Sequence, residues 1–159
     1  MNALLAIVPA VTLLVAVAGL ARLIRETQEE NQRQRQRATV NYITSTIQRQ
    51  HELYSAMHQD TSFAAKASVV ASAEFHQLTS YFGYLEYLAA AVNMRIFDGE
   101  VVSRTIGSRI IRAYETFREW METERRRLNN NTVYEELDIL VADLRERRDQ
   151  RNAVQKPAE

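Results

Sequence analysis

Few residues in this 159-residue chain have the types and spacing that metal or nucleophilic chemistry requires. His51 and His58 are seven residues apart. That spacing is about 10 Å along one helix, which is too far for both rings to bind the same metal ion. His76 falls on another predicted helix, and the chain contains no cysteine. We therefore expect no metal site and no cofactor.

Paired carboxylates occur at Glu119 with Glu122 and at Glu135 with Glu136. Adjacent side chains on a helix point in different directions, and charged helix faces are usually just solvated, so these pairs do not indicate acid–base catalysis. The sequence also contains no Gly-x-Ser-x-Gly elbow and no glycine-rich phosphate loop. We expect no catalytic residues and no enzymatic activity.

The most distinctive polar residues surround Asp98, which opens the clearest predicted turn because a glycine follows it and Asp can bond its own backbone. One interpretation is structural: Asp98 caps the next helix, while Arg95 and Arg112 pair with Glu86 or Glu115. The other interpretation is a surface that binds a partner. Its candidate residues are Arg95, Asp98, Arg104 and Arg112.

The elements that must position these residues are predicted to be helices. Hydrophobic residues make up 46% of the chain, whereas there are only 4 glycines and 2 prolines, a balance that favours long helices over strands and turns. We therefore predict an all-α fold. The formal net charge is +0, which argues against nucleic acid as a partner.

Residues 39–145 are predicted to form a small antiparallel helical bundle. Apolar residues recur at three- and four-residue steps in four stripes, at 40–57, 69–92, 102–120 and 134–144. Residues 60–62 supply N-cap chemistry, three asparagines at 129–131 break the third helix, and Thr132 with Glu135 forms a capping box. The first stripe is narrow enough for a coiled coil, so a homodimer is an open alternative. We expect the polar segment 146–159 to be disordered.

An uncharged, mostly apolar run from Ala3 to Ala21 precedes the bundle. Because such a run is long enough to span a bilayer as a helix, residues 1–24 are predicted to be a transmembrane anchor. Basic residues lie on its C-terminal side, which predicts an inner-membrane protein with the N-terminus outside and the C-terminal domain in the cytoplasm. A cleaved signal peptide, releasing a secreted enzyme, is the alternative, although the basic residues that usually begin one are absent.

Residues 25–38 are polar and lack an apolar stripe, so we expect a solvated helical connector that continues the membrane helix as a stalk. Glu29 and Arg33 have the spacing of a favourable ion pair. The arginines of this region could also bind anionic lipid headgroups. The candidate lipid contacts are Arg22, Arg25, Arg33, Arg35 and Arg37.

The C-terminal part of the chain has a pattern that is found in a known family. The residues that carry it are 85–90, 92–98, 110–115 with Phe117 and Trp120, and 134–137. On these positions the segment 84–144 resembles the bacterial and phage domain of unknown function DUF4760. The resemblance implies a helical fold and an N-terminal membrane segment, and it implies no mechanism, since the family has no agreed activity. This chain has Ile96 where the family favours glycine.

Together these features predict a membrane-anchored cytoplasmic helical module that acts through protein–protein interaction. Its role would be regulatory or, as the resemblance suggests, in phage–host conflict. The expected partners are the lipid bilayer and another protein. The alternative is a small structural or membrane-perturbing protein that acts through its transmembrane helix and self-assembly.

Overall fold

The computed structural model describes the backbone of residues 2–155 and the side chains of residues 19–154 other than Arg49 and His58. Its regular structure is helical, which confirms the predicted all-α class. In chain order the helices are α1 (Asn2–Gln59), α2 (Phe63–Ala67), α3 (Ala73–Asn93), α4 (Gly99–Thr105), α5 (Gly107–Thr116), α6 (Arg118–Leu128) and α7 (Glu135–Gln155).

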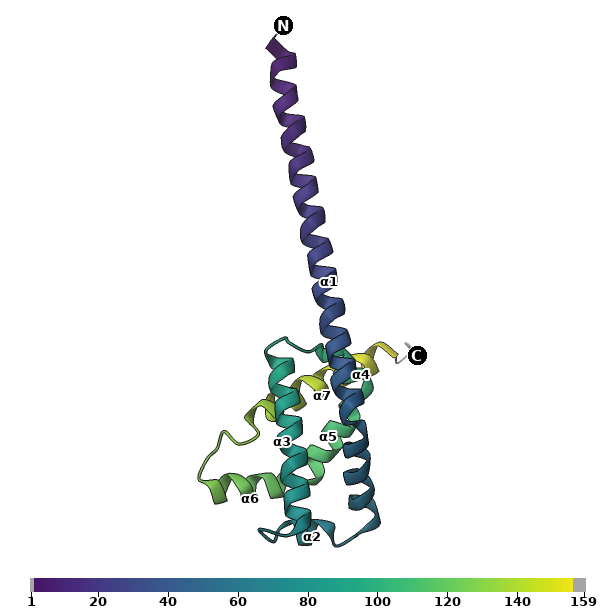
Figure 1. Ribbon diagram of the computed structural model, residues 1–159, viewed down its shortest axis with the longest axis vertical. Helices are drawn as coiled ribbons and strands as arrows, with labels where there is room; N and C mark the ends of the chain where they lie inside the picture. Colours follow the sequence, from purple (N-terminus) through teal and green to yellow (C-terminus); the bar gives the residue numbers. More distant parts are fainter. Residues whose placement is uncertain (1, 156–159) are drawn as a thin grey trace.

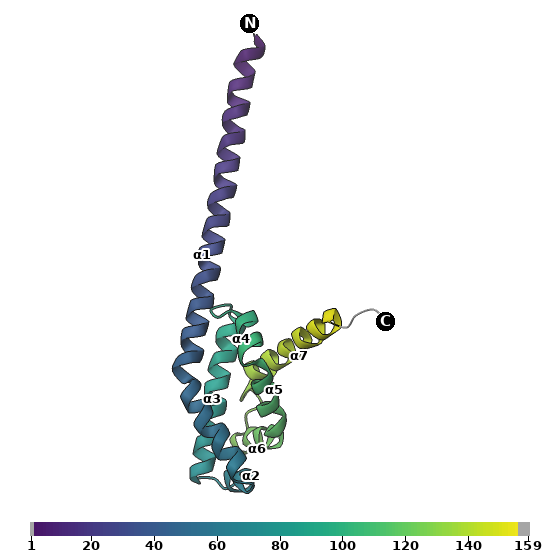
Figure 2. The same cartoon turned by 90° about the vertical axis from the view of Figure 1, so that its right-hand side faces the viewer.

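One very long helix and a compact bundle make up the molecule (Figure 1). The N-terminal part of α1 projects from the bundle, and its C-terminal part lies beside α3 (Figures 1 and 2). Thr39 is the first fully buried residue of α1 among the side chains described. The core of the bundle therefore begins at Thr39, and the described side chains of the helix before it are exposed except for the half-buried Arg35 and Gln36.

The core lies where α3 and α5 both pack against α7, with α6 closing one end. Leucines and aromatic rings fill it, and Phe82 of α3 stacks on Trp120 of α6 with ring centroids 5.7 Å apart. The Trp120 indole Nε1–H donates a 3.0 Å hydrogen bond to the buried carbonyl of Ala67, which ties α6 to α2. The large apolar side chains with less than 2% exposure that build this core are Leu78, Phe82, Leu85, Leu88, Val102, Ile110, Met121, Leu137, Leu140, Val141 and Leu144.

The structure corrects the prediction of a transmembrane anchor at residues 1–24. Among the residues that the structure describes, no helix is both long enough and apolar enough to cross a bilayer. α1 has 58 residues, but its described side chains from Gly19 to Arg37 are mostly arginine, glutamate and glutamine in contact with solvent. The side chains of residues 1–18 lie outside the described residues. The predicted single-pass placement in the inner membrane is wrong on this finding.

The second predicted helix is divided into α2 and α3. Ala71 has a left-handed backbone with φ 71°, and Ser72 caps α3 by accepting a hydrogen bond from the Phe75 N–H. Val69 and Val70, which extend the apolar stripe in the sequence, are exposed in the resulting loop. The apolar stripe of the sequence therefore continues across the break between α2 and α3, and only the Ser72 cap marks that break.

The third predicted helix is divided into α4, α5 and α6. Non-helical backbone at Ile106 and Phe117 separates them, and both side chains are buried. Gly107 lies so close to α7 that a Cβ atom there would be 3.3 Å from a methyl group of Leu144. The chain bends at these points because the bends place two large side chains in the core. The predicted break after α6 is confirmed, and Asn129 adopts φ 48° at the helix end.

Two further expectations concern the C-terminal tail and the apolar stripe of α1. The segment 146–159 does not begin as a disordered tail, since α7 continues to Gln155 and Arg151 donates a 2.9 Å hydrogen bond to Ser103 of α4. Residues 156–159 lie outside the described residues. The predicted seam of α1 is also divided, because Ile43 is buried in the bundle while Val40 and Ile47 are exposed.

Candidate functional site

An open hollow of about 420 Å³ lies where α1 leaves the bundle. We call it the turn hollow, because the turn between α3 and α4 forms its floor. Two residues of α1 and three of α7 complete the wall. Its lining residues are Gln32, Arg35, Val92, Asn93, Arg95, Phe97, Asp98, Gly99, Glu100, Ile139, Asp143 and Arg147.

The turn is held in place by its own backbone and by α1. The N–H groups of Ile96 and Phe97 both donate to the Ala91 carbonyl, and Arg95 adopts φ 60°. This left-handed conformation costs a non-glycine residue about 1–2 kcal/mol, so the surrounding contacts must hold it. The Asp98 N–H donates to the Thr39 hydroxyl at 2.8 Å, which links the turn to α1.

Asp98 also starts α4. Its carboxylate accepts hydrogen bonds from the N–H groups of Glu100 at 2.9 Å and Val101 at 3.1 Å. Such an N-cap satisfies donors that a helix start otherwise leaves open and contributes about 1 kcal/mol. The predicted capping role of Asp98 is confirmed, so this carboxylate is already occupied.

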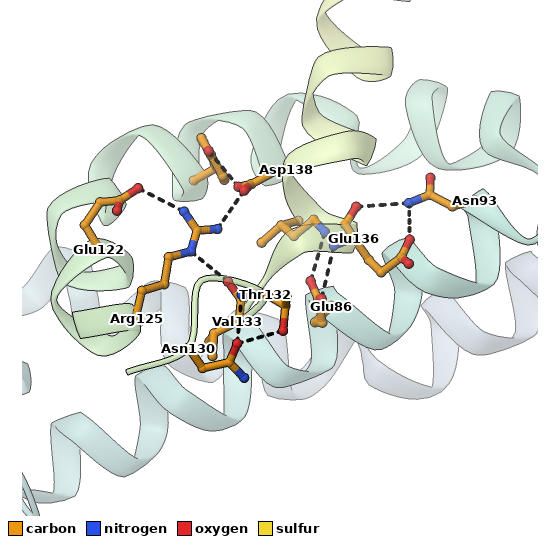
Figure 3. Close-up of polar contacts among 11 residues, drawn as sticks. Glu86, Asn93, Glu122, Arg125, Asn130, Thr132, Val133, Glu136 and Asp138 are labelled. Atoms are coloured by element: carbon orange, nitrogen blue, oxygen red, sulfur yellow. Dashed lines mark hydrogen bonds and ion pairs between the residues drawn. The ribbon is translucent and has the colours of Figure 1, made fainter. Parts of the chain in front are cut away.

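The wall that α7 contributes depends on contacts with α3 and α6 (Figure 3). The Glu86 carboxylate of α3 accepts hydrogen bonds from the N–H groups of Glu136 at 3.1 Å and Leu137 at 2.8 Å. Asn93 donates to the Glu136 carboxylate at 2.6 Å. Burial raises the pKa of the Glu86 carboxyl, and the two N–H donors oppose this in part. The N-cap of α7 therefore comes from a helix 50 residues earlier in the chain.

The structure corrects the prediction of a capping box at the start of α7. The Thr132 hydroxyl donates to the Asn130 side chain at 2.8 Å and does not cap the helix. Tyr134, between Thr132 and α7, has φ 63°, so the backbone turns away before the helix begins. Arg125 of α6 fixes this approach by bonding the Val133 carbonyl at 2.8 Å and Asp138 at 2.6 Å (Figure 3).

Each of the three carboxylates of the turn hollow has a hydrogen-bond partner in the bundle. Besides the cap at Asp98, Glu100 bonds Arg104 at 2.5 Å and Arg147 at 3.4 Å, and Asp143 bonds Arg147 at 2.7 Å. The hydrogen bond from Arg104 lowers the pKa of the Glu100 carboxyl, so that group is ionised at neutral pH.

Arg35 and Arg95 differ from Arg147. Among the residues that the structure describes, no carboxylate lies within ion-pair distance of either guanidinium. Both line the turn hollow, which therefore has two guanidinium groups without an ion-pair partner among the described residues.

Apolar side chains border these charges. Met94 is 70% exposed, Ile96 is 53% exposed and Ile139 is 52% exposed. Met94 and Ile96 flank Arg95 in the turn, and Ile139 lines the hollow from α7. Exposed apolar side chains beside charged ones are typical of surfaces that bind another protein.

The structure brings together only part of the predicted partner surface. Arg95 and Asp98 share the hollow, and Arg104 lies beside it through its pair with Glu100. Arg112 is at the other end of the bundle, where its Nη1 donates to the Tyr54 hydroxyl at 3.3 Å. Tyr54 and the Thr39 that holds Asp98 are 15 residues apart on α1. That separation is about 22 Å along the helix.

The predicted ion pairs of Arg95 and Arg112 with Glu86 or Glu115 are absent from the described residues. Glu86 caps α7, and Glu115 pairs with Arg145 at 3.0 Å. Helix periodicity predicts which residues share one face of a helix, but it does not show which helices pack against each other.

The candidate lipid contacts all lie on α1, and four of the five are exposed. The predicted Glu29–Arg33 pair is present at 3.8 Å, and Arg22 pairs with Glu26 at 2.8 Å. Arg35 instead lines the turn hollow. Arg25 and Arg37 are exposed.

Sequence reasoning missed the contribution of α7 to this site. Ile139, Asp143 and Arg147 lie in a segment that was divided between the bundle and a disordered tail. Their spacing of four residues was the available signal, because it places all three on one helix face.

A comparison with known proteins identifies a family. The model of a family described as a domain of unknown function, DUF4760, matches residues 6–144. The match extends beyond the segment 84–144 that carries the resemblance and includes most of α1. No curated protein and no solved structure matches the chain.

Proposed function

Starting from the fact that this chain belongs to the DUF4760 family, we propose that it is a protein-interaction module that binds an acidic segment of a partner protein in the turn hollow. The observation that carries the proposal is the pair Arg35 and Arg95. Both residues line a hollow whose three carboxylates have hydrogen-bond partners of their own, and no described carboxylate pairs with either arginine.

The chemistry of the partner segment follows from the surroundings of these arginines. A guanidinium binds a carboxylate through two parallel N–H donors, so two acidic residues would complement Arg35 and Arg95. Met94, Ile96 and Ile139 would be covered by apolar side chains of the same segment. Apolar contacts supply most of the affinity in such an interface, while charge pairs set its specificity.

The test uses the full chain with a photo-crosslinking amino acid in place of Ile96, irradiated in cells. The crosslinked partner peptide is identified by mass spectrometry and synthesised, and its affinity is measured by calorimetry. We expect a peptide with at least two acidic residues next to apolar ones. Crosslinking only to neutral or basic peptides would contradict the proposal.

Charge reversal gives the matched control. Arg35→Glu combined with Arg95→Glu should weaken binding of the synthetic peptide at least about tenfold, because like charges then face each other. Arg112→Glu combined with Arg118→Glu makes the same charge change outside the hollow and should leave binding unchanged. Lysine in place of the acidic residues of the peptide should restore binding to the reversed protein. Equal loss in both double variants would show that net charge, and not the hollow, governs binding.

A second candidate function is that of a self-associating structural protein. Val40 and Ile47 are seven residues apart on α1 and are 48% and 45% exposed. Apolar residues at heptad spacing can form the seam of a coiled coil between two copies. Sedimentation equilibrium should then show a dimer that Val40→Lys with Ile47→Lys dissociates, while Val69→Lys with Val70→Lys leaves it intact. A monomeric wild-type chain would exclude this function.

A further inference from the structure

A second hollow, of about 400 Å³, lies between α1 and α3. We call it the α1–α3 cleft. Thr46, Gln50 and Leu53 line it from α1, and Ser80, Tyr81 and Tyr84 line it from α3. Its volume falls in the range of about 300–1,000 Å³ that is usual for small-molecule sites. It is separate from the turn hollow, and no residue lines both.

Gln50 is the unusual residue of this cleft. It interrupts the apolar stripe of α1, yet it is only 8% exposed. A buried carboxamide is costly unless its polar atoms are bonded, so its partners need to be accounted for. Its Nε2 donates to the Tyr84 hydroxyl at 3.2 Å.

Two neighbouring hydroxyl groups lie beside this carboxamide. The hydroxyl oxygens of Thr46 and Tyr84 share a hydrogen bond of 2.6 Å. The Thr46 hydroxyl also lies 2.7 Å from the Tyr42 carbonyl and 3.0 Å from the Ile43 carbonyl. Since Nε2 of Gln50 is the atom that bonds the Tyr84 hydroxyl, the NH2 group of the carboxamide points at Tyr84.

This orientation leaves one edge of the carboxamide available to the cleft. Gln50 has a second N–H and a carbonyl oxygen, and no described residue bonds either of them. None of the described polar side-chain atoms is both fully enclosed and without a partner, so the carbonyl oxygen reaches open space. The Gln50 carboxamide thus has one donor and one acceptor that no described residue uses.

The rest of the lining is neutral, aromatic or acidic. Burial raises the pKa of Tyr81 to about 12 and also raises that of Tyr84, so both phenols stay uncharged. Glu52 and His76 lie at the rim. Among the described lining residues there is no arginine or lysine. Such a lining suits an uncharged molecule and disfavours a phosphate.

We propose that the α1–α3 cleft binds an uncharged purine, as the free base or the nucleoside, through the carboxamide edge of Gln50. A glutamine carboxamide pairs with the adenine edge by accepting from the N6 amino group and donating to N7. The rings of Tyr81 and Tyr84 supply aromatic surface for the base. Glu52 is placed at the rim to accept hydrogen bonds from ribose hydroxyls, a role that acidic residues have in other nucleoside sites.

The test is calorimetric titration of the full-length protein with adenosine, inosine, 7-deazaadenosine and adenosine monophosphate. Adenosine should bind at a ratio of one to one. Inosine replaces the N6 donor by an acceptor and 7-deazaadenosine lacks N7, so both should bind at least about tenfold more weakly. The monophosphate should also bind more weakly than adenosine. Absence of adenosine binding at 1 mM, or equal binding of adenosine and inosine, would overturn the proposal.

Two variants connect the binding to the cleft. Gln50→Leu removes the carboxamide and should lower adenosine affinity at least about tenfold. Because Gln50 is buried, the second variant uses an exposed position: Ser80→Phe fills the cleft from α3 and should abolish binding while the helix signal in circular dichroism is unchanged. Ser55→Phe on the exposed face of α1 is the control. Adenosine binding that survives Ser80→Phe would place the site elsewhere and refute the assignment.

Discussion

The cap that Glu86 provides for α7 predicts a stability change with a defined dependence on pH. Glu86→Gln keeps one acceptor oxygen but replaces the other by an NH2 group, which cannot accept from a backbone N–H. One of the two donors, Glu136 N–H at 3.1 Å or Leu137 N–H at 2.8 Å, then loses its partner. Leaving a partly buried donor unpaired costs about 1–3 kcal/mol, so we expect unfolding free energy to fall by about 2 kcal/mol.

The pH dependence follows from the raised pKa of Glu86, whose ordinary value is 4.5. The folded state binds this proton more tightly than the unfolded state does. The contribution of Glu86 to stability is therefore full below pH 4.5 and declines as the pH rises through the folded pKa. Glutamine does not titrate, so its contribution to stability does not change with pH. The stability gap between wild type and Glu86→Gln should be larger at pH 4.5 than at pH 8.

Urea denaturation followed by circular dichroism at both pH values measures this gap. Glu135→Gln is the control, because it removes the same charge from the exposed first residue of α7 and should cost less than about 1 kcal/mol. A difference in stability that widens as the pH rises would show that the two N–H donors affect the pKa of Glu86 more than burial does. The absence of a gap at both pH values would show that this contact does not stabilise α7.

Three further predictions concern other contacts of the fold. Trp120→Phe leaves the buried Ala67 carbonyl without its donor and should lower unfolding free energy by about 1–3 kcal/mol in urea denaturation. Asp98→Ala removes both acceptors at the start of α4 and should cost about 1 kcal/mol in the same assay, whereas Asp98→Asn should cost less. The hydrogen bond from Lys66 lowers the pKa of Asp60 from 3.8 to about 2, so the stability that this carboxylate provides is present above pH 3.8 and is lost as the pH falls towards 2. In an NMR titration, Lys66→Met should move the Asp60 midpoint back towards 3.8.

The sequence predicted local features of the chain well. The Asp98 cap and the break at Asn129 depend on residues next to one another, and both are present. Periodicity also identified core residues such as Phe82 and Leu137, because a helix has the same repeat whatever it packs against.

Features that depend on contacts between distant segments were not predicted. Glu86 caps α7 across 50 residues, and no local pattern shows that these two segments meet. Val69 and Val70 continue an apolar stripe in the sequence but lie in a loop, since the Ser72 cap decides where α3 begins. For the candidate site, Arg95 and Asp98 were identified from their turn. Arg35 and Arg147 were not, because their place in the hollow depends on how α1 and α7 pass it.

The unbroken path of α1 through Thr39 also fixes an angular relation. A helix turns about 100° and rises about 1.5 Å with each residue, so the described stretch from Gly19 to Arg37 sets both the distance and the direction in which its far end faces. Inserting one residue there would rotate anything attached at that end by about 100° relative to the bundle. Inserting seven residues would restore the direction of the attached group to within about 20° and move it by about 10 Å. A comparison of the two insertions would separate the effect of orientation from that of distance.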